Sequence, residues 1–166
     1  MYQTTRNPGN PVSFITNFKI YLQVSVNLHQ WSDLEDTARL KSVSLTKDEI
    51  LKSYSDATIS MMTLNKAASG IMTKYEAHAA TDITGFGILG HAQNLAEAQK
   101  AKTKMIIDRI PVLKGMGKAE KELGNMFKLA EGKSAETSGG LLISIPASNA
   151  EAFMEKLKVV KITIYP

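Results

Sequence analysis

The sequence predicts an α/β domain in which helices pack on a mixed β-sheet. Three observations indicate this class. Apolar residues alternate with polar ones in residues 20–26 and 160–165, they recur at helical spacing in residues 50–75, and a short strand of small residues leads into a glycine-rich helix start after residue 82. Strands and helices alternate, but not as a regular series of βαβ units. A length of 166 residues, 43% hydrophobic and 22% charged, fits one globular domain.

The N-terminal part of the chain carries turn signals before the first predicted strand. The segment Asn7-Pro8-Gly9-Asn10-Pro11 is typical of turns, so we expect residues 1–18 to be an arm or linker and residues 19–166 to form the domain. From residue 20 to residue 26 every second position is apolar, which predicts a strand with one buried side. Trp31 follows this strand, and we expect it to pack onto the sheet.

A long helix is predicted to begin at Thr46. Thr46 and Glu49 have the spacing of a capping box, in which each side chain accepts a hydrogen bond from the other residue's backbone N–H. We expect a break further on, because Asn65 can cap a second helix and Gly70 weakens the middle. Apolar residues recur here at steps of three and four: Ile50, Tyr54, Ala57, Met61, Leu64, Ala68, Ile71 and Tyr75.

The most informative stretch is residues 79–91, which read AATDITGFGILGH. The first three are small, as in a strand crowded by another backbone, and Asp82 stands at the strand's end. Gly85 and Gly87 allow the chain to turn into a helix. Free N–H groups at a helix start attract anions, and a carboxylate beside them can hold a divalent cation that bridges to phosphate. The buried face of this helix is predicted to contain Ile88, Leu89, Ala92, Leu95 and Ala96.

A purely structural interpretation of this turn remains open on the sequence alone. Asp82 or Thr84 can cap the helix, and the glycines can serve close packing of the strand against the helix. The glycine spacing of residues 85–90 also matches the dinucleotide-binding fingerprint. We discount that match, because the acidic residue expected about 20 positions later is missing and Lys102 and Lys104 occupy the region.

Simpler roles are predicted for His91 and the segments after it. A single histidine in a helix is more often a surface or hydrogen-bonded residue than a metal ligand, so His91 is not assigned to a site. Residues 105–107 predict a strand, and Pro111 suits the first turn of a short helix that continues to Lys121.

A second glycine pair precedes the last part of the chain. Residues 136–140, ETSGG, open a predicted strand from Leu141 to Ile145. The double glycine permits close approach of a ligand or of another backbone, and a plain turn before the strand is an equally good explanation. A helix capped by Ser148 or Asn149 and a strand over residues 160–165 complete the predicted fold.

The composition excludes several classes of function. Without cysteines the chain has no disulfide, no thiolate metal site and no cysteine nucleophile. The net charge is +4 and the basic residues are scattered, so nucleic acid is not an expected partner. No apolar run approaches the length that spans a bilayer, and residues 1–11 do not resemble a signal peptide. We therefore expect no membrane association and a cytoplasmic location.

Five stretches together resemble selenophosphate synthetase, also called selenide, water dikinase, and specifically the C-terminal domain of eukaryotic-type members. In chain order they are VNLHQW (26–31), LNKAASGIM (64–72), AHAATDITGFGILGH (77–91), GNMF (124–127) and ETSGGLL (136–142). The resemblance runs from about Gln23 to Leu157. It implies the fold of the C-terminal domain of aminoimidazole ribonucleotide synthetase, in which helices cover a mixed sheet.

The resemblance implies a specific activity. Enzymes of this family make selenophosphate, AMP and phosphate from ATP, water and selenide, and Mg²⁺ neutralises charge on the phosphates. The family holds Mg²⁺ with three aspartates, and the one in the TDITGFG motif is present here as Asp82. We expect further residues to lie near the phosphates or the nucleotide: Thr84, Gly85, Gly87, Thr137, Ser138, Gly139 and Gly140.

The resemblance does not extend to the family's N-terminal ATP-binding domain, which supplies the catalytic lysine, the cysteine or selenocysteine position and the other two aspartates. We therefore expect no catalytic side chain in this chain and no turnover of ATP by this polypeptide alone. The full-length family enzymes are homodimers largely through that other domain, so we expect a homodimer only of the full-length enzyme. The family's Leu-Thr-Lys-Pro-Leu-Gly is replaced by TNFKIY at residues 16–21, and a family proline is Ala135 here.

Two functions from different classes remain open at this stage. In the first, the chain is the C-terminal part of a selenide, water dikinase that acts on ATP and selenide. In the second, it is a non-catalytic relative that keeps the fold for dimerisation or partner binding. A member of the same superfamily with another phosphorylated substrate fits the five stretches less well.

Overall fold

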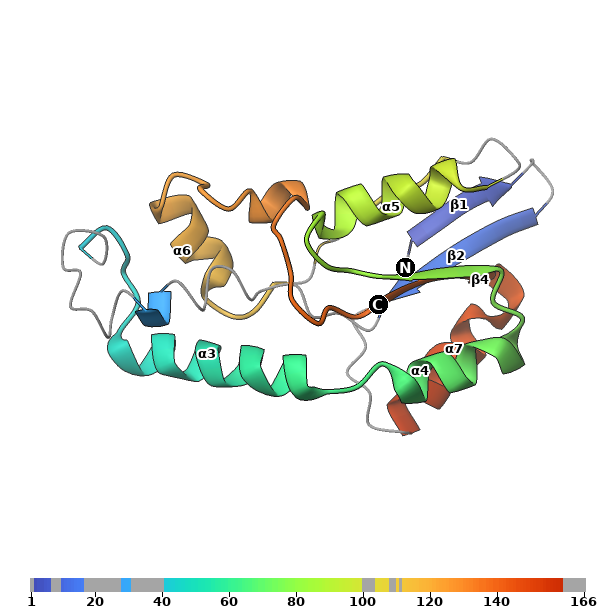
Figure 1. Cartoon of the computed structure of the whole chain (residues 1–166), viewed down its shortest axis with the longest axis horizontal. Coiled ribbons are helices and arrows are strands. Elements are labelled where there is room, and N and C mark those ends of the chain that lie inside the picture. The colour runs from blue at the N-terminus through green and yellow to red at the C-terminus, as the bar shows by residue number, and fades with distance from the viewer. Residues whose placement is uncertain are drawn as a thin grey trace.

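The computed structural model describes residues 2–6, 10–16, 28–30, 41–99, 104–107, 110 and 112–159, with the backbone alone described for 2–6 and 10–16. Figure 1 shows the described elements, which in chain order are β1 (Tyr2–Arg6), β2 (Asn10–Thr16), α3 (Lys47–Met62), α4 (Lys66–Met72), η1 (Thr73–Tyr75), β3 (Ala79–Asp82), α5 (Gly87–Glu97), α6 (Met116–Glu122), η2 (Leu129–Glu131), β4 (Leu141–Pro146) and α7 (Ala147–Val159).

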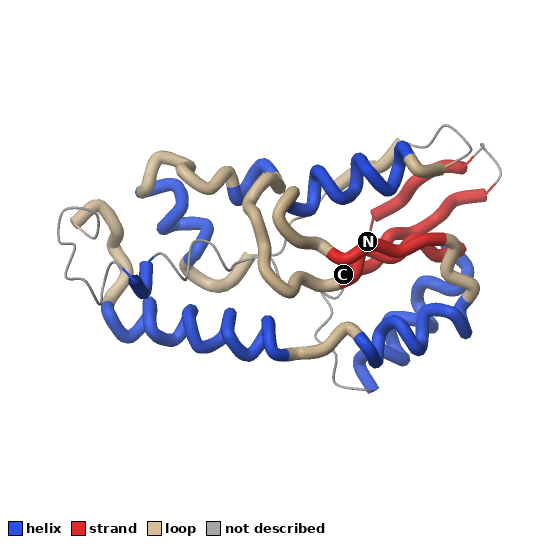
Figure 2. The backbone as a smooth tube through the Cα atoms, in the orientation of Figure 1, coloured by secondary structure: helices blue, strands red, loops and turns tan. Residues whose placement is uncertain are grey.

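The described strands form one sheet in the order β1-β2-β4-β3, and each neighbouring pair is antiparallel. Helix α5 lies on one side of this sheet, and α4 and α7 lie together on the other (Figure 2). The α/β class with helices packed on a sheet is therefore confirmed. The predicted mixture of parallel and antiparallel pairs is not seen among the strands that the structure describes.

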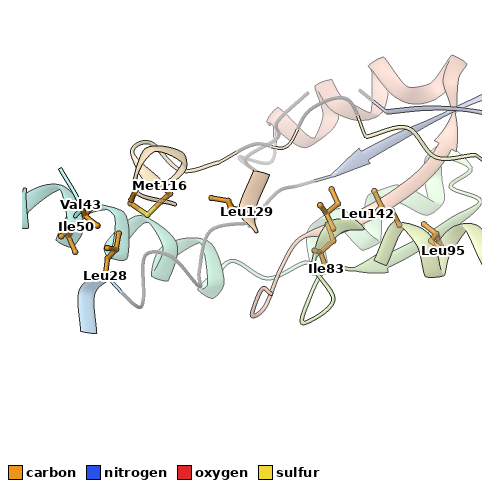
Figure 3. Packing of buried hydrophobic residues seen from close by; sticks show 11 residues of the cluster. Leu28, Val43, Ile50, Ile83, Leu95, Met116, Leu129 and Leu142 are labelled. Carbon is orange, nitrogen blue, oxygen red and sulfur yellow. The ribbon is translucent and has the colours of Figure 1, made fainter. Parts of the chain in front are cut away.

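Side chains of β4 point alternately to the two helical layers, as the pleat of a strand requires. Leu142 packs in the cluster that contains α5, whereas Ile143 and Ile145 pack in the cluster that contains Ala68 of α4 and Phe153 of α7. Figure 3 follows the first cluster away from the sheet to α3 and α6; its buried members are Leu28, Val43, Ile50, Ile83, Ile88, Ala92, Leu95, Met116, Ala119, Leu129 and Leu142.

Helix α3 begins as the sequence predicts. The Thr46 hydroxyl oxygen accepts from the N–H of Glu49 at 3.2 Å, and the Thr46 N–H donates to Glu49 Oε2 at 2.8 Å, which is the predicted capping box. The predicted break is also confirmed, since α3 ends at Met62 and α4 begins at Lys66. Asn65 occupies the N-cap position of α4, but its side-chain oxygen makes no cap bond there; its side-chain NH2 group donates to the Gly139 carbonyl instead.

In the described part of residues 1–18, which we expected to be an arm or linker, the structure has two strands. β1 and β2 pair with each other, and β2 pairs along β4, so these residues extend the sheet. The physical reason is in the sequence: residues 12–16 read VSFIT, which is rich in strand-forming residues, and turn residues precede them at positions 7–9. A hairpin therefore explains the segment better than a linker.

One further prediction of secondary structure is wrong, and another is confirmed only in part. Residues 104–107, where a strand was predicted over 105–107, have no regular secondary structure. None of the described strands pairs with them, and the Ile106 side chain is exposed. The short helix predicted to continue to Lys121 is present as α6, but it begins only at Met116, after Gly115 with a φ of 86° that is incompatible with a right-handed helix. The predicted strands at 20–26 and 160–165, and the positions of Trp31 and Pro111, lie outside the described residues.

Candidate functional site

Asp82 is the last residue of β3 and is exposed to solvent. It pairs with Leu141 at the edge where β4 begins, so the two glycine-containing loops meet beside it. The structure rules out the capping interpretation of this residue: the N-cap position of α5 is Phe86, and no side chain makes a cap bond there. Among the residues that the structure describes, none forms a hydrogen bond or ion pair with the Asp82 carboxylate.

Thr84 anchors the turn that follows Asp82. Its backbone N–H donates to His91 Nε2 at 2.9 Å, and its hydroxyl lies 3.2 Å from the same nitrogen. Its carbonyl oxygen accepts from the N–H of Gly87 at 3.0 Å and from the N–H of Glu136 at 3.1 Å. Both backbone groups of Thr84 are therefore satisfied inside the protein, which fixes the path of the chain between the strand and the helix.

The loop before β4 is attached to the same turn. The N–H of Ile83 donates to the Gly140 carbonyl at 2.9 Å, and the Asn65 side-chain amide donates to the Gly139 carbonyl at 2.9 Å. A Cβ added to Gly139 would lie 1.7 Å from the carbonyl oxygen of Ile83. The double glycine thus permits the close approach of another backbone, one of the alternatives that the sequence left open.

The predicted site residues fall into two groups. Asp82 at the end of β3 and three residues of the two loops, Gly85, Thr137 and Ser138, are exposed, so a ligand can reach them. Thr84 is half-buried, and three glycines are buried: Gly87, Gly139 and Gly140. Close backbone contacts give Gly87 and Gly139 a structural role, and a contact of any of the predicted site residues with phosphate or nucleotide stays a prediction.

Gly87 has a packing role of its own. Its φ is 66°, and an added Cβ would lie 2.6 Å from the carbonyl oxygen of Gly132. That carbonyl accepts from the N–H of Leu89 at 2.9 Å, so residue 132 is held against the first turn of α5. A side chain at position 87 would therefore displace the start of the helix.

The donor set of this region fits one ligand position of a Mg²⁺ site. Asp82 supplies an exposed carboxylate, which is the oxygen ligand that Mg²⁺ prefers. The described residues contain no group of three or more acidic or histidine side chains that could hold a metal by themselves. A cation at Asp82 would therefore need its other ligands from phosphate, water or residues outside the described ones.

Sequence reasoning missed two residues that define this region. Phe86 is 69% exposed although aromatic, and its ring centroid lies 5.5 Å from that of His91. His91 is 7% exposed, and the signal for its burial was present, because it lies three residues after Ile88 and four before Leu95 on the same helix face. Leu89, which we expected to be buried, is 41% exposed.

Comparison with known proteins defines the class of this domain. Residues 8–165 match the family model described as "AIR synthase related protein, C-terminal domain". The chain is also 44% identical over 136 residues to "Selenide, water dikinase 3" of Danio rerio and to "Selenide, water dikinase 2" of Homo sapiens, covering 82% of this chain and 30% of each relative. It is 46% identical over 135 residues to "Selenide, water dikinase" of Dictyostelium discoideum, covering 81% of this chain and 37% of the relative.

The fold and the family match therefore define an AIR synthase related C-terminal domain. Within that class, the chain belongs to the selenide, water dikinase family, also called selenophosphate synthetase, and corresponds to its C-terminal domain. It spans about a third of the length of these curated relatives. In the described part of the chain, no helix combines the length and the apolar character needed to cross a membrane.

Proposed function

We propose that this chain is the part of a selenide, water dikinase that contributes Asp82 as a ligand of Mg²⁺ beside the phosphates of ATP. The reaction is the formation of selenophosphate, AMP and phosphate from ATP, water and selenide. A cytoplasmic location and a homodimer of the full-length enzyme belong to the same proposal. This polypeptide alone does not turn over ATP, because it offers one acidic ligand where the family uses three.

The observation that carries the proposal is the state of the Asp82 carboxylate. It stands at the end of β3, is exposed, and has no partner among the described residues, while the backbone around it is tightly bonded. A carboxylate that neither caps a helix nor pairs with a cation adds nothing to the stability of the fold. A fixed, unpaired carboxylate beside an exposed loop suits a ligand that comes from outside the domain.

Bound Mg²⁺ would neutralise charge on the phosphates during transfer, which is the main requirement of phosphoryl-transfer chemistry. The part of this chain is to hold one carboxylate in position. Thr137 and Ser138 lie on the exposed second loop, where their hydroxyl and backbone groups can donate to phosphate oxygens.

A hybrid enzyme tests the proposal. The matched region of the Dictyostelium discoideum relative, which is 46% identical, is replaced by this chain, and selenide-dependent AMP formation is measured. The hybrid is expected to form AMP, and Asp82→Asn is expected to lower the rate by at least about 100-fold, as for a group that neutralises transition-state charge. Asp56→Asn is the matched control, because Asp56 forms only a surface ion pair with Lys52 at 3.3 Å.

Full activity of the Asp82→Asn hybrid would refute the metal-ligand role. A hybrid that is folded and binds ATP as well as the unmodified relative does, but forms no AMP, would favour the alternative of a non-catalytic relative. For the isolated chain, calorimetry with Mg²⁺ and ATP should give at most weak binding, and a tight stoichiometric isotherm would overturn the claim that one aspartate is insufficient.

A further inference from the structure

We propose that His91 is the positioning residue of Asp82: its neutral ring accepts the backbone N–H of Thr84 and so fixes the turn that presents the carboxylate. The inference rests on the proposed role of Asp82 as a metal ligand and adds a second residue to that site. His91 lies on α5, nine residues after Asp82 in the chain, and acts through the backbone N–H of Thr84.

The geometry determines the protonation state of the His91 ring. A backbone N–H can only donate, so the Nε2 atom that lies 2.9 Å from the Thr84 nitrogen must be an acceptor without a proton. The neutral ring then carries its proton on Nδ1. The Thr84 hydroxyl, 3.2 Å from Nε2, can donate to the same lone pair, which favours the same tautomer.

The bond acts on Asp82 through a short and rigid piece of backbone. One residue, Ile83, separates Asp82 from Thr84, and its N–H is bonded to Gly140. The Thr84 carbonyl accepts from two backbone N–H groups, whereas the Thr84 N–H donates to a side chain, the His91 ring. Removal of the acceptor leaves this half-buried N–H unsatisfied, and the turn must move to find another partner.

His91 is held in place by burial. The side chain is 7% exposed and lies on the apolar face of α5 between Ile88 and Leu95. Its ring also packs against the ring of Phe86, the last residue before α5, at 5.5 Å between centroids. The ring therefore contacts both Thr84 and Phe86. A substitution that keeps the side-chain volume but removes the hydrogen-bond acceptor shows how much the hydrogen bond contributes apart from the packing.

Nuclear magnetic resonance of the ¹⁵N-labelled chain tests the tautomer directly. The chain has three histidines, so the imidazole signal lost in His91→Gln identifies His91. We expect the Nδ1–H tautomer at neutral pH and a strong shift of the Thr84 amide signal in His91→Leu. His78→Leu is the control, since the His78 side chain is exposed and the residue is held through its backbone N–H, which donates to the Ser144 carbonyl at 2.8 Å. An Nε2–H tautomer would overturn the inference.

Conservative substitution distinguishes positioning from packing. The side-chain oxygen of glutamine reaches the place of Nε2, whereas that of asparagine reaches only the place of Nδ1. In the hybrid enzyme we expect His91→Gln to keep kcat within about threefold, and His91→Asn and His91→Leu to lower kcat by about 10- to 100-fold with little change of KM for ATP. Equal rates for glutamine and leucine would show that the acceptor is irrelevant and overturn the inference.

The two proposals fail in different ways. If the parent hybrid forms no AMP, the proposed function fails, and the inference is then decided by the amide signals of Asp82 and Ile83 in the chain itself. Positioning requires these signals to move in His91→Leu and to return to the parent values in His91→Gln. Unchanged Asp82 and Ile83 signals in His91→Leu would overturn it whatever the hybrid does.

Discussion

Substitution of Gly139 by alanine tests how tightly the two loops of the site are joined. The added Cβ would lie 1.7 Å from the carbonyl oxygen and 2.8 Å from the carbonyl carbon of Ile83. Both atoms belong to the backbone, so no side chain can rotate to make room. Since contacts under 3.0 Å essentially do not occur, the two loops must separate by at least about 1.3 Å.

The cost follows from the contacts that this separation breaks. Overpacking of a well-packed site costs about 1–3 kcal/mol, and loss of the 2.9 Å bond between the Ile83 N–H and the Gly140 carbonyl adds about 1 kcal/mol. We therefore expect the free energy of unfolding to fall by about 2–4 kcal/mol, which corresponds to a Tm lowered by roughly 4–16 °C for a chain of this size.

Urea unfolding followed by circular dichroism measures this change, with Gly85→Ala as the matched control. Gly85 lies in the opposite loop, a Cβ there meets no atom within 4 Å, and its φ is not positive. Gly85→Ala should therefore alter the free energy of unfolding by no more than about 1 kcal/mol and can raise it. Equal midpoints for the two variants, at unchanged m, would refute the close backbone contact.

Three further predictions concern single side chains. Asp82→Ala should change the free energy of unfolding by less than about 0.5 kcal/mol, because Asp82 is not a cap; a loss above about 1 kcal/mol in urea unfolding would indicate a structural role. Glu120→Ala should lower it by about 2–4 kcal/mol in thermal unfolding, since the buried Glu120 Oε1 accepts the N–H groups of residues 127 and 129; an unchanged Tm would contradict this. The backbone N–H and the hydroxyl of Thr46 donate to the Glu49 carboxylate and hold its pKa below the ordinary value of about 4.3. The stability that ionised Glu49 adds to the fold is therefore fully present above about pH 4.3 and is lost as the pH falls through the lowered pKa. The free energies of unfolding of the parent and of Glu49→Gln, measured as a function of pH, should therefore become equal in acid. A difference between the two proteins that does not change with pH would count against the capping box.

Local rules were sufficient for much of the fold. The capping box at Thr46, the helix break near Asn65, the strand that ends at Asp82 and the strand from Leu141 each depend on residues within a few positions of one another. Such features can be predicted from spacing and from the preferences of the residue types. The structure confirms all four.

The joining of the two site loops could not be predicted in this way. The Gly139 contact is with Ile83, and the Asn65 amide bonds a residue 74 positions away, so both depend on the tertiary arrangement of β3, β4 and α4. The expectation that His91 is a surface or hydrogen-bonded residue is confirmed in its second half, whereas its burial was within reach of the periodicity and was not predicted. The N-terminal hairpin was missed because its turn residues also suit a linker.

The binding of Mn²⁺ to the hybrid enzyme in the presence of ATP tests the central claim most directly. Mn²⁺ accepts the same carboxylate and phosphate oxygens as Mg²⁺, and electron paramagnetic resonance reports its free concentration. We predict that Asp82→Asn weakens Mn²⁺ binding by about tenfold or more, equivalent to about 1.4 kcal/mol, while Asp56→Asn leaves it unchanged. Equal Mn²⁺ affinity in the parent and in Asp82→Asn would contradict the account.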